Sequence, residues 1–250
     1  METFQLSEKL LKKIADLISA KKNTPLKKIV KDIHFADMAE IINELNEQQG
    51  IYLIKLFDSE KTSEILTELD EDVREKILKA LSVKEIADEI EELDSDDAAD
   101  ILGELSDERK EEVISEISDD NLADDLKELL SYEEDSAGGL MAKELVQANE
   151  NWSITKCLKE IKKQGENVTR VHSIYVVDDK QKLIGRLSLK DLITSPAKNL
   201  IKDIYIPKVD SVNVYDDGEE VAKIMSKYDL EAIPVVDNKK QLVGRITIDD

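Results

Sequence analysis

The chain has 250 residues, enough for two domains of ordinary size, and its formal net charge is −22 at pH 7. Its one cysteine excludes an internal disulfide, and its two histidines exclude zinc sites built on clustered Cys and His. The longest apolar runs have four residues, far short of the roughly 20 that span a membrane. The first residues lack a secretion signal, so the composition suits the cytosol.

The charge is distributed unevenly along the chain. Residues 1–31 contain eight lysines and three acids, a net of +5, whereas residues 58–135 contain 31 acids and eight bases, a net of −23. An acidic surface is a poor partner for nucleic acid, whose phosphates are bound by Lys and Arg. Cations are a natural partner, and the alternative is a solvated surface that keeps the protein in solution.

Residues 6–20 are predicted to form an amphipathic helix that ends at Asn23-Thr-Pro25. A twelve-residue repeat follows, in which an apolar residue precedes a small polar or acidic residue. The pair occurs eight times, at Ile33-His34, Leu45-Asn46, Phe57-Asp58, Leu69-Asp70, Leu81-Ser82, Leu93-Asp94, Leu105-Ser106 and Ile117-Ser118.

The second residue of each pair is a helix N-cap type in seven of the eight cases. His34 is the exception and is expected to substitute as a cap, while Ser82 and Glu85 predict a capping box. Apolar residues recur at offsets of four, seven, eight and eleven from the caps, although the series is weaker after Asp70 and has Asp125 at offset seven from Ser118. These positions form one face of a helix. Helices of about nine or ten residues are marginal alone, so we expect them to stack into a superhelix.

The second half of the chain contains a duplicated pattern. After a turn-rich stretch at 132–139, residues 174–191 align with 233–250 at an offset of 59. Each copy reads as a strand, a polar turn, a second strand carrying Gly-Arg and the start of a helix. Short strands (145–148, 212–214) and amphipathic helices (154–164, 219–228) precede them. The second copy reaches position 250 where its last helix should begin, so the native protein is expected to continue.

This β-α-β-β-α order resembles the CBS module, and the duplication resembles a CBS pair. Together with the helical repeat, the segments ELDSDDAADIL (92–102) and EDSAGGLM (134–141) make the chain similar to the cytosolic region of MgtE-family magnesium channels. The predicted fold class is α plus α/β: an N-terminal α-helical superhelix of short twelve-residue repeats, then a tandem CBS pair. The expected boundaries are 1–131 for the helical domain, 132–141 for a linker, and 142–200 and 201–250 for the CBS modules.

The resemblance implies a feedback gate. In that family, Mg²⁺ binds between the helical domain and the CBS pair and between CBS partners of a homodimer, and binding closes a transmembrane pore that this chain lacks. The region would lie on the cytoplasmic side of the membrane. Two alternatives are a regulator that senses adenine nucleotides and an acidic scaffold that docks a basic protein partner.

Asp96 and Asp100 are the first candidate ligands, because residues four apart share one helix face and no basic residue lies four positions from either. For Asp96 the alternative is favourable interaction with the helix dipole. The resemblance adds candidates from the CBS region: Asp203, Asp216, Asp217, Asp237, Asp249, Asp250 and the Gly138 carbonyl. The alternative is that these aspartates form turns and helix caps.

Two pairs match the ribose contact of nucleotide-binding CBS modules, in which Ser or Thr precedes Asp by three residues. They are Thr247 with Asp250 and Ser188 with Asp191, and capping of the next helix is the alternative role. The sequence offers no nucleophile–base pair, phosphate-binding glycine loop or zinc motif, so no catalytic function is predicted. Cys157 and Trp152 are expected to pack in the core.

Overall fold

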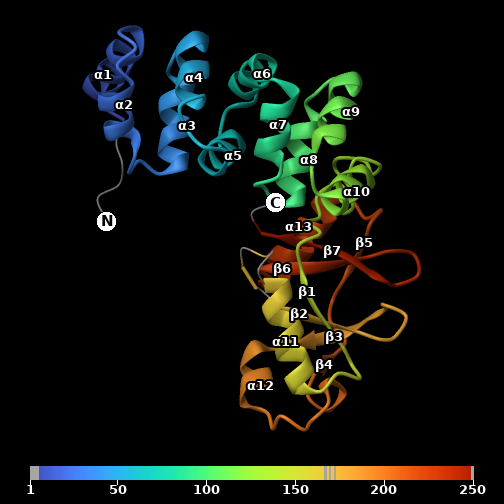
Figure 1. Ribbon diagram of the computed structural model, residues 1–250. Helices are drawn as coiled ribbons and strands as arrows, with labels where there is room; N and C mark the ends of the chain where they lie inside the picture. The colour runs from blue at the N-terminus through green and yellow to red at the C-terminus, as the bar shows by residue number, and fades with distance from the viewer. Residues whose placement is uncertain (1–5, 166–167, 169, 172, 249–250) are drawn as a thin grey trace. The chain divides into compact units, whose positions relative to one another are not determined.

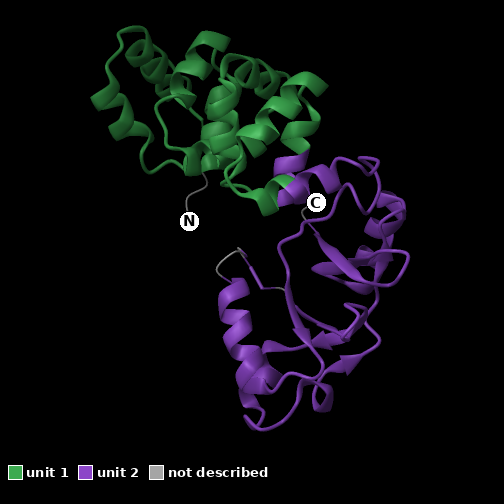
Figure 2. Cartoon of the chain, turned by 45° about the vertical axis from the view of Figure 1, so that its right-hand side comes forward, with its two compact units in different colours: residues 1–93, 100–123 green, residues 94–99, 124–250 purple. Residues whose placement is uncertain are grey.

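The computed structural model describes residues 6–165, 168, 170–171 and 173–248. The chain divides into two compact units, shown in Figure 2. Unit 1 comprises Met1–Leu93 and Asp100–Ala123, and unit 2 comprises Asp94–Ala99 and Asp124–Asp250. The units therefore interleave along the chain. His172, Asp249 and Asp250 lie outside the described residues.

Short helices form the first half of the chain, and alternate helices pack together: α3 with α5, α4 with α6, α5 with α7, and α7 with α9 (Figure 1). Helices of eight to ten residues directly follow seven of the eight predicted caps, which confirms the repeat. The prediction of Ser118 as a cap is wrong by one residue, because α10 begins at Asp120 and Asp119 Oδ1 accepts the Asn121 N–H. The helices are α1 (Glu8–Ser19), α2 (Asn23–Val30), α3 (Phe35–Asn43), α4 (Glu47–Ile54), α5 (Ser59–Thr67), α6 (Glu71–Ala80), α7 (Val83–Ile90), α8 (Ser95–Gly103), α9 (Asp107–Glu116) and α10 (Asp120–Leu129).

The first helix ends before Asn23 as predicted, and a second helix that was not predicted follows it. The chain turns at Lys21, which has φ of 50°, and α2 begins at Asn23. Pro25 lies in the first turn of α2, where a backbone N–H has no partner within the helix, so the missing N–H of proline costs nothing there.

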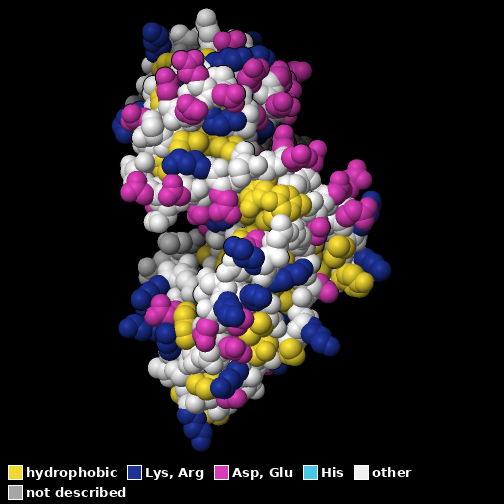
Figure 3. Space-filling view, turned by 90° about the vertical axis from the view of Figure 1, so that its right-hand side faces the viewer, with side chains coloured by type: hydrophobic (Ala, Val, Ile, Leu, Met, Phe, Trp, Pro, Cys, Tyr) yellow, Lys and Arg dark blue, Asp and Glu magenta, His cyan; other side chains and the backbone are white. Residues whose placement is uncertain are grey.

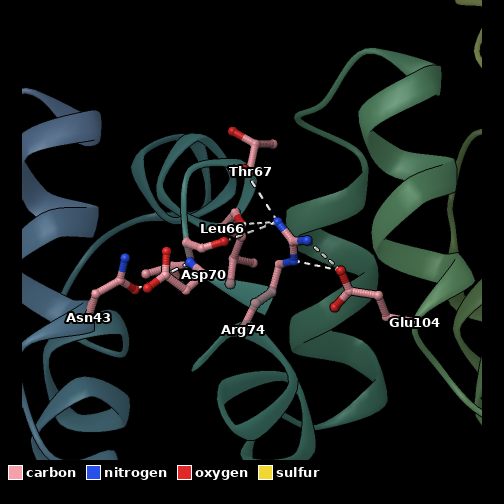
Figure 4. A network of polar contacts seen from close by, with 7 residues as sticks. Asn43, Leu66, Thr67, Asp70, Arg74 and Glu104 are labelled. Carbon is pink, nitrogen blue, oxygen red and sulfur yellow. Dashed lines mark hydrogen bonds and ion pairs between the residues drawn. The ribbon is translucent and has the colours of Figure 1, made fainter. Parts of the chain in front are cut away.

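The cap predictions are confirmed at two informative positions. The His34 Nδ1 accepts a hydrogen bond from the Ala36 N–H at 3.3 Å. Ser82 and Glu85 form a reciprocal capping box. Asp70 and Ser106 depart from the pattern, because neither side chain accepts a cap hydrogen bond. Instead, the Asp70 N–H donates to Asn43 Oδ1 at 3.3 Å (Figure 4).

Basic side chains cap the carboxyl ends of helices in unit 1. The Arg74 guanidinium donates to three carbonyls at the end of α5 and, through Nε, to Glu104 Oε1 at 2.8 Å (Figure 4). Lys61 Nζ donates to Val30, Lys31 and Ile33 carbonyls at 3.0–3.3 Å. Arg109 donates to the Leu78 and Leu81 carbonyls. These donors satisfy carbonyls that helix ends leave unpaired.

Two small sheets form the centre of unit 2, in the orders β1-β2-β3-β4 and β5-β6-β7. In each, the first two strands are parallel and the next is antiparallel, which confirms the duplicated β-α-β-β pattern. The elements are β1 (Val146–Asn149), α11 (Ile154–Gln164), β2 (Ile174–Val177), β3 (Leu183–Leu187), α12 (Leu189–Thr194), the 3-10 helix η2 (Ile201–Asp203), β4 (Ile206–Pro207), β5 (Val212–Asn213), α13 (Gly218–Tyr228), β6 (Ala232–Val236) and β7 (Leu242–Thr247).

The core of the first module contains Cys157, which is fully buried, with Trp152 packed against it. Both predictions are confirmed. No helix in the described part of the chain is long and apolar enough to cross a bilayer.

The segment 132–142, which contains the predicted linker 132–141, is held along the second module by backbone hydrogen bonds. The N–H groups of Ala137 and Gly138 donate to the Asp216 and Val214 carbonyls at 2.8 Å, and Ala142 exchanges two backbone hydrogen bonds with Arg245. A Cβ at Gly138 would lie 2.5 Å from the Cγ of Tyr132. This close approach explains why a residue without a side chain stands at position 138.

Candidate metal centre

Three carboxylates meet in unit 2, at the start of α8. Asp94 precedes the helix, Asp96 lies in its first turn, and Glu144 lies just before β1. One oxygen from each lies within 4.8 Å of the others, and all three side chains are half-buried. These residues form the candidate metal centre.

Ser95 holds Glu144 in place. The Ser95 N–H and Oγ–H donate to Glu144 Oε2 at 3.1 and 2.7 Å. The Lys143 N–H in turn donates to Ser95 Oγ at 2.8 Å, and Ser95 is fully buried. Glu144 therefore satisfies donors at the start of α8, where the helix dipole also favours a negative charge.

Arg245 is the basic residue beside this group. Its Nε donates to the Glu144 backbone carbonyl at 2.6 Å, and one terminal nitrogen lies 3.4 Å from Asp94 Oδ2. The Arg245 side chain is 8% exposed. The Arg245 guanidinium offsets part of the negative charge of the three carboxylates. Carboxylate oxygens are ligands that a divalent cation prefers.

The distances between the three carboxylate oxygens can be compared with the coordination geometry of Mg²⁺. Mg²⁺ holds oxygens at about 2.0–2.1 Å in an octahedron, so its ligands lie no more than about 4.2 Å apart. The three oxygens here all lie within 4.8 Å of one another. They are therefore close enough together to bind one magnesium ion, either directly or through waters that the ion retains.

Of the two predicted helix ligands, the structure brings Asp96 into the three-carboxylate group. Asp100 is exposed one turn later on α8 and is assigned to unit 1. The group among the described residues consists of Asp94, Asp96 and Glu144, so Asp100 is not a member.

The aspartates predicted from the CBS resemblance lie elsewhere, in local structure. Asp237 Oδ1 accepts the N–H groups of Lys239 and Gln241, both at 2.8 Å, and so forms the hairpin turn after β6. Asp217 caps α13. Asp216 and Asp203 accept hydrogen bonds from Asn213 and Leu200. The Gly138 N–H donates to Val214. Their roles as ligands stay predictions.

Sequence reasoning missed Asp94 as a ligand, and it missed Glu144. Asp94 was interpreted as a cap, although it stands in the same acidic run as Asp96. Glu144 lies about fifty residues further along the chain, outside the repeat. No periodic signal connects it to α8, so only the fold brings it there.

A second candidate site is a pocket of about 370 Å³ bordered by both sheets of unit 2, within the size range of ligand sites. Tyr175 and Arg186 line it from the first module, and Lys208, Ala232 and Pro234 line it from the second. The Tyr175 hydroxyl is buried and has no hydrogen-bond partner among the described residues. Burial raises the pKa of this phenol to about 12, although Arg245 and Arg186 act in the opposite direction.

The residues predicted to contact ribose lie near this pocket in part. Ser188 lines an adjoining pocket with Arg186 and Ser173. Its Oγ accepts the Lys190 N–H at 3.2 Å and so caps α12, where Asp191 lies in the first turn. Thr247 is the buried last residue of β7.

Comparisons with known families cover most of the chain. Residues 33–135 match the family described as MgtE intracellular N domain, and residues 137–198 and 201–250 match the CBS domain. The magnesium transporter MgtE of Thermus thermophilus is 42% identical over 122 residues, and that of Bacillus subtilis is 33% identical over 122 residues. Each match covers 49% of this chain and 27% of the relative.

Two solved structures resemble nearly the whole chain. One is the cytosolic domain of the Mg²⁺ channel MgtE in complex with ATP, with a TM-score of 0.87 and 30% identity over 96% of this chain and 97% of that one. The other is the soluble part of a magnesium transporter, with a TM-score of 0.80 and 27% identity over 97% of this chain and 95% of that one.

Proposed function

Since this chain belongs to the MgtE family of magnesium transporters, we propose that it is a magnesium-sensing regulatory region whose sensor includes Asp94, Asp96 and Glu144. The observation that carries the proposal is the meeting of three carboxylates, which all lie within 4.8 Å of one another. The matched segment spans about a quarter of the curated relatives, so the transmembrane pore that it would regulate is part of this proposal.

The proposed mechanism is neutralisation of excess negative charge. Without a dication the carboxylates repel one another, and with one they are drawn together. An ion shifts a conformational equilibrium only by its differential affinity for the two states. Binding at the start of α8 would therefore favour the compact state, and feedback would follow when intracellular Mg²⁺ is abundant.

Limited proteolysis of the chain in 0–20 mM MgCl₂ tests this function. We expect protection in the millimolar range, and we expect Asp96→Asn combined with Glu144→Gln to raise the midpoint at least severalfold. Asp107→Asn combined with Glu108→Gln, at the exposed start of α9, is the matched control. Protection by ATP alone would instead support a nucleotide regulator, and protection by neither would support an acidic scaffold.

We also propose a homodimer formed through the CBS modules. Leu189 and Ile193 lie four residues apart on α12 and are 47% and 65% exposed, and Leu158 on α11 is 42% exposed. Burying such side chains against a second copy would be favourable. Sedimentation equilibrium should show a dimer that Ile193→Glu weakens.

A specific observation favours an additional ligand, an adenine nucleotide in the pocket beside Tyr175. A similar structure contains ATP, and the buried Tyr175 hydroxyl needs a partner. We predict that Tyr175→Phe raises the stability of the nucleotide-free chain by up to about 1–3 kcal/mol, because an unpaired buried hydroxyl is removed. Urea denaturation without and with ATP measures both effects. Unchanged ATP stabilisation in this variant would contradict a contact between the hydroxyl and the nucleotide.

A further inference from the structure

The first two helices of unit 1 form a strongly basic end of the helical stack. We call α1, α2 and their flanking residues, 6–31, the basic hairpin. All its lysines are exposed: Lys9, Lys12, Lys13, Lys21, Lys22, Lys27, Lys28 and Lys31. The described acids among them are Glu8 and Asp16. Figure 1 shows α1 and α2 at the end of the stack of unit 1 that is opposite to α9.

The lysines of the basic hairpin differ from those of later helices in their partners. Within the described residues, none of the eight forms an ion pair with a carboxylate. In α6 and α7, by contrast, Lys76, Lys79 and Lys84 each pair with an acid four residues away. The charge of the basic hairpin is therefore available to an external partner.

The rest of the surface restricts what that partner can be. Among the described residues of unit 1, no large apolar side chain is exposed, since those in that class all lie in unit 2. Protein interfaces usually depend on buried aromatic or aliphatic anchors. A layer of phosphates needs none, because flexible ammonium groups can bind it without a fitted contact.

We propose that the basic hairpin binds the phosphate headgroups of an anionic lipid bilayer. The inference rests on the proposed function for one point, which is that a region of a membrane transporter is held close to a bilayer. The charge distribution then sets an orientation. Acidic side chains cover much of the helical unit on the face drawn in Figure 3, and residues 58–135 carry a net −23. The same lipid surface would repel them, so the hairpin would face the bilayer while the acidic helices point away.

Vesicle sedimentation tests the inference without using magnesium. The chain is mixed, in 50 mM NaCl and EDTA, with phosphatidylcholine vesicles that contain 0% or 30% phosphatidylglycerol. We expect binding to the anionic vesicles only, and we expect 500 mM NaCl to abolish it because salt screens exposed charges. Each lysine near such a surface contributes roughly fivefold in affinity. Replacing Lys12, Lys13, Lys27 and Lys28 with Gln should therefore weaken binding at least tenfold.

The matched control replaces Lys76, Lys79, Lys84 and Lys127 with Gln, which changes the net charge equally outside the hairpin. This control should bind within about twofold of the parent chain. Equal weakening by both variants, or equal binding to neutral vesicles, would overturn the inference. So would binding to duplex DNA in the same buffer without binding to vesicles, since that result would identify a nucleic acid as the partner. The Asp96→Asn, Glu144→Gln variant should still bind vesicles, so failure of magnesium sensing and failure of lipid binding give different results.

Discussion

Glu89 stands at a position of the repeat that is apolar in six of the eight units. It is the seventh residue after the cap Ser82, and its side chain in α7 is 9% exposed. Its Oε2 atom is buried without a hydrogen-bond partner among the described residues. Other repeats have Ile41, Leu53, Ile65, Ile77, Ile101 and Val113 at this offset, and Asp125 is the second exception.

The pKa of Glu89 is raised to about 8, mainly by burial and to a smaller extent by four nearby acids, Asp88, Glu92, Glu85 and Asp58. The folded protein therefore retains this proton well above the pH at which the unfolded chain releases it. The buried Glu89 lowers the free energy of unfolding least below pH 4.5, where its carboxyl is protonated in both the folded and the unfolded chain. Its contribution to stability falls as pH rises from about 4.5 to 8, and it is constant above that range.

We predict that Glu89→Gln stabilises unit 1 increasingly as pH rises. Relative to the parent chain, its free energy of unfolding should increase by about 2–4 kcal/mol between pH 5 and pH 8, at about 1.4 kcal/mol per pH unit. Urea denaturation across this range measures the difference. Glu112→Gln, at an exposed position of α9 that is not among the acids acting on Glu89, should follow the parent at every pH. Parallel profiles for Glu89→Gln and the parent would contradict the prediction.

At the residue scale, local patterns predict helix caps, but they do not show which distant side chains meet. His34 and Ser82 were identified correctly because a cap bonds to backbone two or three residues away, within the local pattern. Asp96 meets Glu144 because a backbone path of about fifty residues returns to α8. Propensity and spacing carry no information about such a path.

At the scale of elements, short helices are linked by capping residues that are distant in sequence. Lys61 and Arg109 each stand three residues after a cap, and each donates to the carboxyl end of a helix 28–31 residues earlier. These side chains donate to carbonyls that would otherwise bond to water. The contacts matter because a short helix has few hydrogen bonds of its own. The apolar stripe predicted these helices and their lengths, but it could not predict which polar side chains reach a neighbour.

We predict that Arg109→Met destabilises unit 1 by about 1.5–3 kcal/mol, because the carbonyls at the end of α6 lose a charged donor while the apolar stem is retained. Lys84→Met, which removes an exposed ion pair on α7, should cost no more than about 0.5 kcal/mol. Thermal unfolding of both variants provides the comparison. Equal losses would mean that the helix-end contacts of Arg109 contribute little.

The segment 132–142 also acts as a structural element, although it contains no helix or long strand. We predict that Gly138→Ala costs about 1–3 kcal/mol, since the added methyl would meet the Tyr132 ring at 2.5 Å. Gly103→Ala, where the new Cβ meets nothing within 4 Å, should be neutral or slightly stabilising. Adding Tyr132→Ala should recover part of the loss in Gly138→Ala. No recovery would show that the ring is not the source.

At the scale of the whole molecule, a net charge of −22 disfavours every compact state. Both Na⁺ and Mg²⁺ should therefore stabilise the chain, but for different reasons. We predict that 5 mM MgCl₂ raises the melting temperature more than NaCl of equal ionic strength does, because Mg²⁺ binds and Na⁺ only screens. Scanning fluorimetry at matched ionic strength makes the comparison. Asp96→Asn should reduce the excess, and identical shifts for the two salts would argue against a bound ion.

The order of the elements could be predicted because the sequence repeats with periods of twelve and 59 residues. The division of the chain into two units could not be predicted. Sequence boundaries are drawn at single points, whereas unit 2 takes Asp94–Ala99 from the middle of the helical repeats. Residues 94–99 belong to unit 2 because Ser95 bonds to residues 143 and 144 and because Asp94 pairs with Arg245.

This interleaving limits how the protein can be recombined. A CBS pair excised at residue 132 would retain Glu144 and Arg245 but lose Asp94 and Asp96, so it would not report on ion binding. In a chimaera that joins the helical half of one relative to the CBS half of another, each parent would supply part of the carboxylate set. Such a chimaera would keep the group only if its two parents have carboxylates at the positions of Asp94, Asp96 and Glu144.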